Sequence, residues 1–442
     1  MIRSIEEVRA RVAAQKTLLP AFYGQVDFDH TPERFTEDAS LAVATDRIPM
    51  GVAVTRDDLD RVRAYTMLGD QVADAYAALI PQYGFRRLIA MLTQACEQGA
   101  EAVQDAPPEL AAFIADMEAT PDWVDMDLVR EGARLDRNAT AHLAPFAIRG
   151  AFMATFLNKY SALPMALTGT LSNDTAAKRV NETATFFTTT VLPGALERHG
   201  EGFKAAAMVR LMHSMVRINA LRSGQWDSRV YGVPIPQVDQ MPAGLIPIFL
   251  MAFALIRKGR TTFTRDERAK VELARYRCFL LGLPEDLLAD TPEGIVRIMT
   301  ARNSTLRRGF DDATCGALIR ATLDAYLPPD RSPANRLHDR IERRFAKAFF
   351  LRHFMEGDRV RARELGIEVT RLDEAVFVAC ALLVYGRMAA FRMAGQVPVL
   401  RDLTDAVLVR RVRGLLARYG HAEYTTDASK YRSAAATPAP AV

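Results

Sequence analysis

Apolar residues recur along this chain at the three- and four-residue spacing of helices, in segments separated by proline and glycine. Alternating strand-like runs are scarce, and no fixed-period repeat or glycine/serine linker divides the chain. We therefore expect an all-α protein, compatible with globin-like helix packing, with a single large helical domain over residues 1–424 and a disordered tail at 425–442. The helices are predicted at about 56–78, 84–101, 127–149, 174–191, 202–222, 266–281, 293–308, 311–325, 332–355, 372–391 and 403–419.

The predicted helix at 202–222 carries a histidine in apolar surroundings. His213 shares a helical face with small and aliphatic residues, and only Arg210, Ser214 and Arg217 form a polar strip. A neutral imidazole in such a place can bind a metal, and a single histidine suits haem because the porphyrin supplies four more nitrogens. The alternative is a core histidine whose ring is satisfied by a backbone carbonyl.

The helix predicted at 174–191 offers polar groups for the same site. Arg179 and Thr183 lie one turn apart on one face, with Glu182 beside them. An arginine is a natural partner for a porphyrin propionate, and a threonine hydroxyl can hydrogen-bond to iron-bound oxygen. The alternative is an ordinary amphipathic helix, on which Arg179 and Glu182 form a surface ion pair of little energetic value.

Three short motifs in order give the chain a family resemblance. RVNETATF begins at Arg179, VRLMHSMVR places His213 thirty residues after Thr183, and a connector ending GVPIPQVDQ follows. Together they resemble the haem-dependent oxygenase family of latex clearing protein (rubber oxygenase) and MpaB. Upstream, TPDWVDMDLVREGARL resembles the tryptophan-containing entry to that family's core. The resemblance covers residues 80–260 best, so we expect the haem-binding core there.

The resemblance implies a role for each of these residues. His213 corresponds to the proximal iron ligand of a haem b, and Arg179 and Thr183 to residues that support haem binding and oxygen chemistry. Arg217, one turn beyond His213, is a further expected cofactor contact. Glu182 falls where rubber-cleaving members have a lysine, and we assign it a catalytic role with Arg179 and Thr183.

Two departures from the rubber-cleaving pattern bear on the substrate. A carboxylate at Glu182 cannot replace an ammonium group, because it only accepts hydrogen bonds. Rubber-cleaving members also use a glutamate upstream of the arginine helix as an acid/base group, whereas no Asp or Glu occurs here between Asp136 and Asp174. These differences make cleavage of polyisoprene by the same proton route doubtful, and favour a smaller apolar substrate.

Composition narrows the remaining classes of function. Of the 442 residues 49% are hydrophobic and 25% charged, as in soluble globular proteins, and a net charge of +4 does not indicate a nucleic-acid partner. The four cysteines are scattered and form no metal or disulfide motif. No histidine has a glutamate three residues before it, which argues against a bundle di-iron site. Five other histidines (His30, His142, His199, His338 and His421) are expected at the surface or at helix caps.

We find no targeting signal in the sequence. The N-terminal segment has no apolar core of a secretory signal, which predicts a cytoplasmic protein. The longest uninterrupted apolar run, at 243–256, is too short to span a bilayer, so we expect no transmembrane segment, while peripheral membrane contact stays open. That run is expected to form a buried helix.

These observations predict a haem b-dependent oxygenase that acts with O2 on an apolar, alkene- or lipid-like substrate, with oxidative cleavage of a carbon–carbon double bond as the reaction in view. The alternative, from a different class, is a non-catalytic helical protein that binds haem or lipid. The sequence does not distinguish the oligomeric states.

Overall fold

The computed structural model describes residues 3–35, 52–168, 173–420 and 422, and most of these residues lie in helices. Their only strand-like pairing is an isolated bridge between Phe35 and Leu306. The expected all-α class is confirmed, whereas the predicted tail at 425–442 lies outside the described residues. The first half contains α1 (Ile5–Leu18), α2 (Pro20–Tyr23), α4 (Arg56–Thr66), α5 (Gln71–Ala77), α6 (Ile80–Tyr83), α7 (Phe85–Gln98), α8 (Pro108–Glu118), α9 (Met126–His142), α10 (Ala144–Ala154), α11 (Lys159–Leu167), α12 (Asn173–Thr189) and α13 (Glu201–Arg222). The second half contains α14 (Ser228–Tyr231), α15 (Met241–Arg257), α16 (Arg265–Leu280), α17 (Pro292–Thr305), α18 (Ala317–Asp324), α19 (Pro333–Phe354), α20 (Arg359–Glu364), α21 (Arg371–Gln396) and α22 (Pro398–Tyr419).

Local sequence explains where helices begin and where some predicted segments break. The segment predicted at 56–78 is two helices, because α4 ends at Thr66 and Asp70 caps α5 by accepting from the backbone N–H of Ala73. The segment predicted at 127–149 is likewise divided between α9 and α10, with Pro145 in the first turn of α10. The segment at 311–325 opens with a π-helical turn, Asp312–Gly316, before α18.

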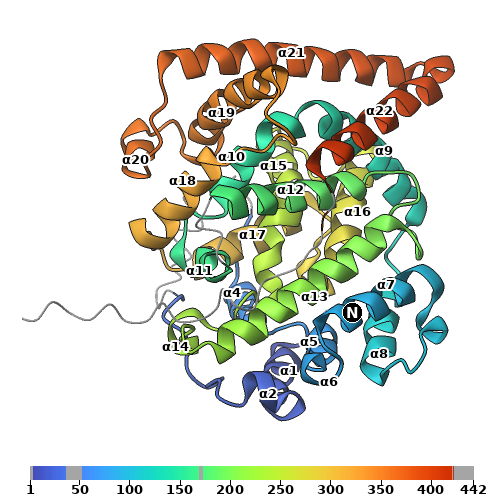
Figure 1. Ribbon diagram of the computed structural model, residues 1–442, viewed down its shortest axis with the longest axis vertical. Coiled ribbons are helices and arrows are strands. Elements are labelled where there is room, and N and C mark those ends of the chain that lie inside the picture. Colours follow the sequence, from blue (N-terminus) through green and yellow to red (C-terminus); the bar gives the residue numbers. More distant parts are fainter. Residues whose placement is uncertain (1–2, 36–51, 169–172, 421, 423–442) are drawn as a thin grey trace, which may run out of the picture.

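Figure 1 shows α13 crossing the middle of the molecule, with the N-terminal helices α1, α2 and α5 to α8 below it. The helices α15, α16 and α17 lie behind α12 and α13, and α21 runs along the opposite edge from α1. α9 packs closely on α16, because Gly132 has no side chain: a Cβ there would lie 2.1 Å from the carbonyl oxygen of Ala269. The central helices are therefore surrounded by others on most sides.

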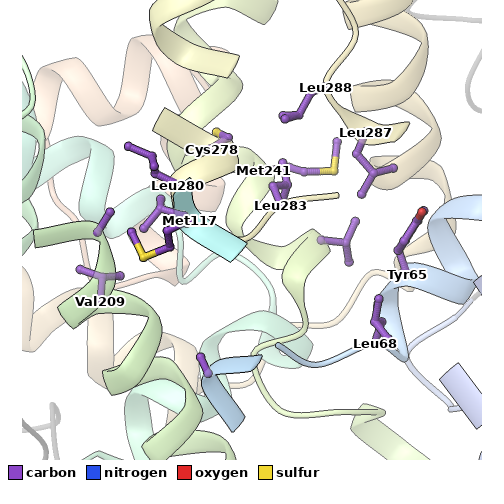
Figure 2. Close-up of a cluster of buried hydrophobic side chains, with 14 of the residues drawn as sticks. Tyr65, Leu68, Met117, Val209, Met241, Cys278, Leu280, Leu283, Leu287 and Leu288 are labelled. Atoms are coloured by element: carbon purple, nitrogen blue, oxygen red, sulfur yellow. The ribbon is translucent and has the colours of Figure 1, made fainter. Parts of the chain in front are cut away.

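The buried apolar residues form one large cluster, a smaller one and a group of three alanines (Ala176, Ala321 and Ala325). The large cluster draws on helices from α1 to α17, and Figure 2 shows part of it, where Met117 and Val209 lie near Met241, Cys278 and other side chains. The smaller cluster joins α10, α18, α19 and α21 around Phe345 and Phe350. Burial of apolar residues thus extends along the chain from α1 to α21.

Two apolar helices differ from their expected surroundings. α15 contains the apolar run at 243–256, but it is not buried all round, because Leu250 keeps 59% of its surface exposed. α21 is the one helix, among the described residues, that by length and composition alone could cross a membrane, and little of it is buried. The absence of a transmembrane segment stays a prediction, because length and composition alone do not show that α21 crosses a membrane. Charged residues near both ends of α21 had interrupted its apolar run.

Candidate functional site

One face of α13 is held by ion pairs to α5. Arg210 forms a bidentate pair with Asp70, at 2.7 and 2.8 Å, and also lies 2.9 Å from Asp116. Burial opposes the charge of Asp70, but the adjacent Arg210 outweighs it and lowers the pKa of that carboxyl. Since both side chains are almost fully buried, these pairs fix the rotation of α13 about its axis.

Arg217, two turns along α13, is also occupied by protein groups. Its guanidinium pairs with the fully buried Asp74 and donates to the carbonyl oxygens of Pro234 and Ile235. Tyr23 donates a further hydrogen bond to Asp74. Arg217 was expected to contact the cofactor, and that contact stays a prediction; in the structure its guanidinium group bonds to groups of the protein.

His213 lies between these two arginines in the sequence. The ring is half-buried, and its Nδ1 atom is completely shielded and makes no hydrogen bond to any described residue. Burial lowers the pKa of His213 to about 4, and the charges of Arg217 and Arg179 act in the same direction, against Asp70. At neutral pH the imidazole is therefore uncharged, which is the form that binds a metal.

α12 brings its polar residues to the same turn of α13. Arg179 donates to Glu182 at 2.7 Å and to the sulfur of Met212, the residue before His213, at 3.5 Å. The Arg179–Glu182 pair is mostly buried, contrary to the alternative of a surface pair, and Lys178 lies 3.9 Å from the same carboxylate. Thr183 is half-buried one turn after Arg179, and its register puts it on the same face. The structure thus brings Arg179 and Glu182 next to the His213 turn.

A separate cavity borders the opposite face of α12. It is small, with a volume of roughly 50 Å³, and its polar groups include Asn181, Glu342 and Tyr419. Asn181 lies about half a helical turn from Arg179 and Thr183, so this cavity is not the space between α12 and α13. The volume of a cavity alone does not identify the candidate site here.

No group of three or more potential protein ligands for a metal ion occurs among the described residues. A site with His213 as its protein ligand therefore needs a group that brings other ligands with it. The shielded, unbonded Nδ1 of a neutral imidazole fits such a group, and the nearby Arg179 fits a carboxylate carried by it.

Several residues that the sequence left aside turn out to be structural. His142 was expected at the surface but is buried: its Nδ1 faces the Asn138 carbonyl at 3.0 Å, its Nε2 faces Arg411, and its ring packs on Phe391. Sequence reasoning also missed Met212, and the partners Asp70 and Asp74 on α5. A signal for the two acids was present, because they lie one turn apart in a helix with little other charge.

Comparison with known proteins shows the family to which the chain belongs. No curated protein matches the chain. Among solved structures, the latex clearing protein LCP in its closed state is similar, with a TM-score of 0.54 and 19% identity over 86% of this chain and 94% of that chain, which supports the same fold. Residues 139–390 match the catalytic domain described as ER-bound oxygenase mpaB/B'/rubber oxygenase, a range that includes His213 and Arg179 and extends well beyond residue 260. The chain therefore belongs to the family of the mpaB/B' and rubber oxygenases.

Proposed function

We propose that this protein is a haem b-dependent oxygenase in which His213 is the protein ligand of the iron. The single observation that carries the proposal is the Nδ1 atom of His213, which is shielded from solvent and has no hydrogen-bond partner among the described residues. Buried polar atoms are nearly always satisfied, so an unsatisfied one needs an explanation. Membership in an oxygenase family supports a bound group that reacts with dioxygen.

The residues around His213 have separate tasks in this proposal. Arg179 would anchor a haem propionate through a charge-assisted hydrogen bond, and Thr183 would donate its hydroxyl hydrogen on the same face. Haem, when bound, supplies the activation of dioxygen, which no amino-acid side chain provides. The buried apolar residues of α13 would exclude water from the site and orient an apolar substrate.

Glu182 would hold or move the proton that the reaction requires. Its carboxylate accepts a hydrogen bond from Arg179 at 2.7 Å, close to the turn of α13 that carries His213. Residues 137–173 contain no acidic side chain that could take this role. Carboxylates near a reaction centre are common general acids and bases. Because the residue differs from the lysine of rubber-cleaving relatives, we propose a smaller alkene- or lipid-like substrate, and expect cis-polyisoprene to be poor or inert.

Oxygen uptake by the purified full-length chain tests the proposal. Protein loaded with haem is mixed with a panel of apolar alkenes and with cis-polyisoprene, and oxygen consumption is followed together with formation of carbonyl products. We expect uptake that depends on both haem and a small alkene. His199→Ala serves as the control for histidine loss, because its ring contacts the Cys96 carbonyl at 3.1 Å, away from His213.

The alternative function predicts a different outcome. A non-catalytic helical binding protein would consume no oxygen with any alkene, even when it carries haem, or would be colourless and co-purify with lipid. Either result would contradict the oxygenase proposal. Location in the cytoplasm stays a prediction from the sequence.

A further inference from the structure

The helices α21 and α22 form a hairpin that covers the body of the protein (the α21–α22 hairpin, residues 371–419). Its inner side is anchored: Asp373 pairs with Arg344 and Lys347, each at 2.9 Å, and Asp405 pairs with Arg137 of α9. α21 packs on α19 and α9, and α22 packs on α9 and α12. Figure 1 shows α21 along one edge of the molecule, with α22 returning from its far end.

The outer side of the hairpin is apolar and exposed. From Ala375 to Gly386, twelve residues of α21, there is no charged side chain. Leu382 is 73% exposed, and the stripe on α22 includes Val399 at 88% and Leu403 at 64%. Exposed apolar patches of this extent on a monomer mark a surface that binds something. Further exposed members are Leu372, Val378, Leu383, Tyr385, Met393, Val397, Leu400 and Val407.

The charge of the hairpin is one-sided. It contains eight arginines and four acidic residues, a net charge of +4, which equals the net charge of the whole chain. Three of the four acids are paired with cations of the protein, and only Asp402 is not among these pairs. The exposed arginines of the hairpin that form no ion pair with any described residue are Arg371, Arg387, Arg392, Arg410, Arg411, Arg413 and Arg418; of these, Arg411 contacts Nε2 of His142.

We propose that the outer face of the α21–α22 hairpin docks on the surface of an anionic phospholipid bilayer. An apolar helical surface bordered by arginines is the chemistry that lies in the headgroup region, with aliphatic side chains inserted and cations facing phosphates. A second copy of this chain is a poorer partner, because a two-fold interface would bring the same arginines against one another. Nothing in this proposal depends on haem at His213.

The hairpin lies on the bilayer rather than crossing it. α21 is long and apolar enough to span, but its other face is bound to the protein. Phe377 and Val384 are packed in the body, and Asp373 is completely buried in its ion pairs. A spanning helix would expose that carboxylate and both apolar contacts, whereas surface docking leaves them intact.

Binding to vesicles tests this surface in the full-length protein. Wild-type protein is mixed with vesicles of phosphatidylcholine containing about a third phosphatidylglycerol, and the bound fraction is measured by flotation. We expect Leu382→Gln/Leu403→Gln to reduce the partition coefficient on the order of tenfold or more. Leu18→Gln, at a residue 66% exposed on α1, is the matched control and should bind like wild type.

A second variant tests the contribution of the exposed arginines. Arg387→Gln/Arg392→Gln should reduce binding to the anionic vesicles by on the order of tenfold and leave weak binding to pure phosphatidylcholine unchanged. Arg9→Gln, on α1, is the control for loss of an exposed arginine. Because the substituted residues are exposed, the variants should fold like the wild type. Far-ultraviolet circular dichroism checks the helix content of every variant.

A direct probe keeps the proposal falsifiable whatever the variants do. The indole fluorescence of Leu382→Trp should shift to the blue and be quenched by brominated lipid, whereas that of Leu18→Trp should not. No binding of wild type to anionic vesicles would overturn the proposal. A dimer in sedimentation that is lost in Leu382→Gln/Leu403→Gln, without vesicle binding, would assign the face to a second copy instead.

Discussion

The two sides of α13 differ in how their buried polar groups are satisfied. On the side facing α5, the guanidinium groups of Arg210 and Arg217 have carboxylate partners within the fold. Toward α12, Met212 accepts from Arg179, and His213, the next residue, keeps a shielded Nδ1 atom that has no hydrogen-bond partner among the described residues. Both sides are buried, so burial alone does not separate structural from functional groups. What separates them is that both guanidinium groups have carboxylate partners, whereas Nδ1 of His213 has no partner among the described residues.

This difference assigns separate tasks to the two sides. The α5 side holds the helix in place through ion pairs that leave little for a ligand to contact. Near α12 lie a neutral imidazole, an arginine and a carboxylate (His213, Arg179 and Glu182), and the imidazole is available to bind a ligand. If the two sides act independently, a substitution on one side should leave the property of the other side unchanged.

Removing a charge on the α5 side should have the largest effect, and on stability. Arg217→Met leaves Asp74 buried without its main cation, which should lower the free energy of unfolding by about 3–5 kcal/mol in urea titrations. Arg217→Met/Asp74→Leu should recover more than half of that loss, because no buried charge remains. Loss of haem with unchanged stability would instead make Arg217 a cofactor contact, as the sequence predicted.

Acid should destabilise the haem-free protein through His213. Burial lowers its pKa to about 4, so between about pH 6.5 and 4 the unfolded chain binds a proton that the folded chain does not. Stability should therefore fall as the pH drops through that range, by up to about 3 kcal/mol. His213→Leu should lose less stability than wild type between pH 7.5 and 4.5 in urea unfolding. Parallel curves for the two proteins would show that the imidazole titrates normally.

Arg179 should matter for haem rather than for the fold. Arg179→Ala removes a charge-assisted hydrogen bond to a propionate, which should weaken haem affinity by about 1.5–3 kcal/mol, measured by titration of haem-free protein. Lys178→Ala, at the adjacent and more exposed cation, should have little effect. Equal haem affinities in both variants would leave Arg179 as a partner of Glu182 only.

Glu182 should affect turnover with little effect on binding. Glu182→Gln preserves the size of the side chain but cannot carry a proton, so the variant should retain haem and its spectrum while turnover falls about tenfold or more. The acidic limb of the pH–rate profile should also shift. A variant with full activity at every pH would exclude the proton-relay role.

The sequence predicted the positions of most helices and the shared face of Arg179 and Thr183, because both follow from helical periodicity. It did not predict that Asp70 and Asp74 would complete Arg210 and Arg217, since these partners are about 140 residues apart in the chain. The outer face of α21 was not predicted either. An apolar stripe such as that around Leu382 normally indicates burial, and only the arrangement of helices shows that no described residue covers it.

The most direct test of the central claim is a spectroscopic titration of the haem-free protein with haem. The account predicts that wild type and His199→Ala bind one equivalent with the same Soret band. His213→Gly should bind haem at least about a hundredfold more weakly. Loss of the ligand itself should cost more than loss of a residue that supports a ligand, which weakens metal binding by about 10- to 100-fold. Added imidazole should restore the wild-type band in His213→Gly. Unchanged affinity and spectrum in that variant, without imidazole, would contradict the assignment of His213 as the iron ligand.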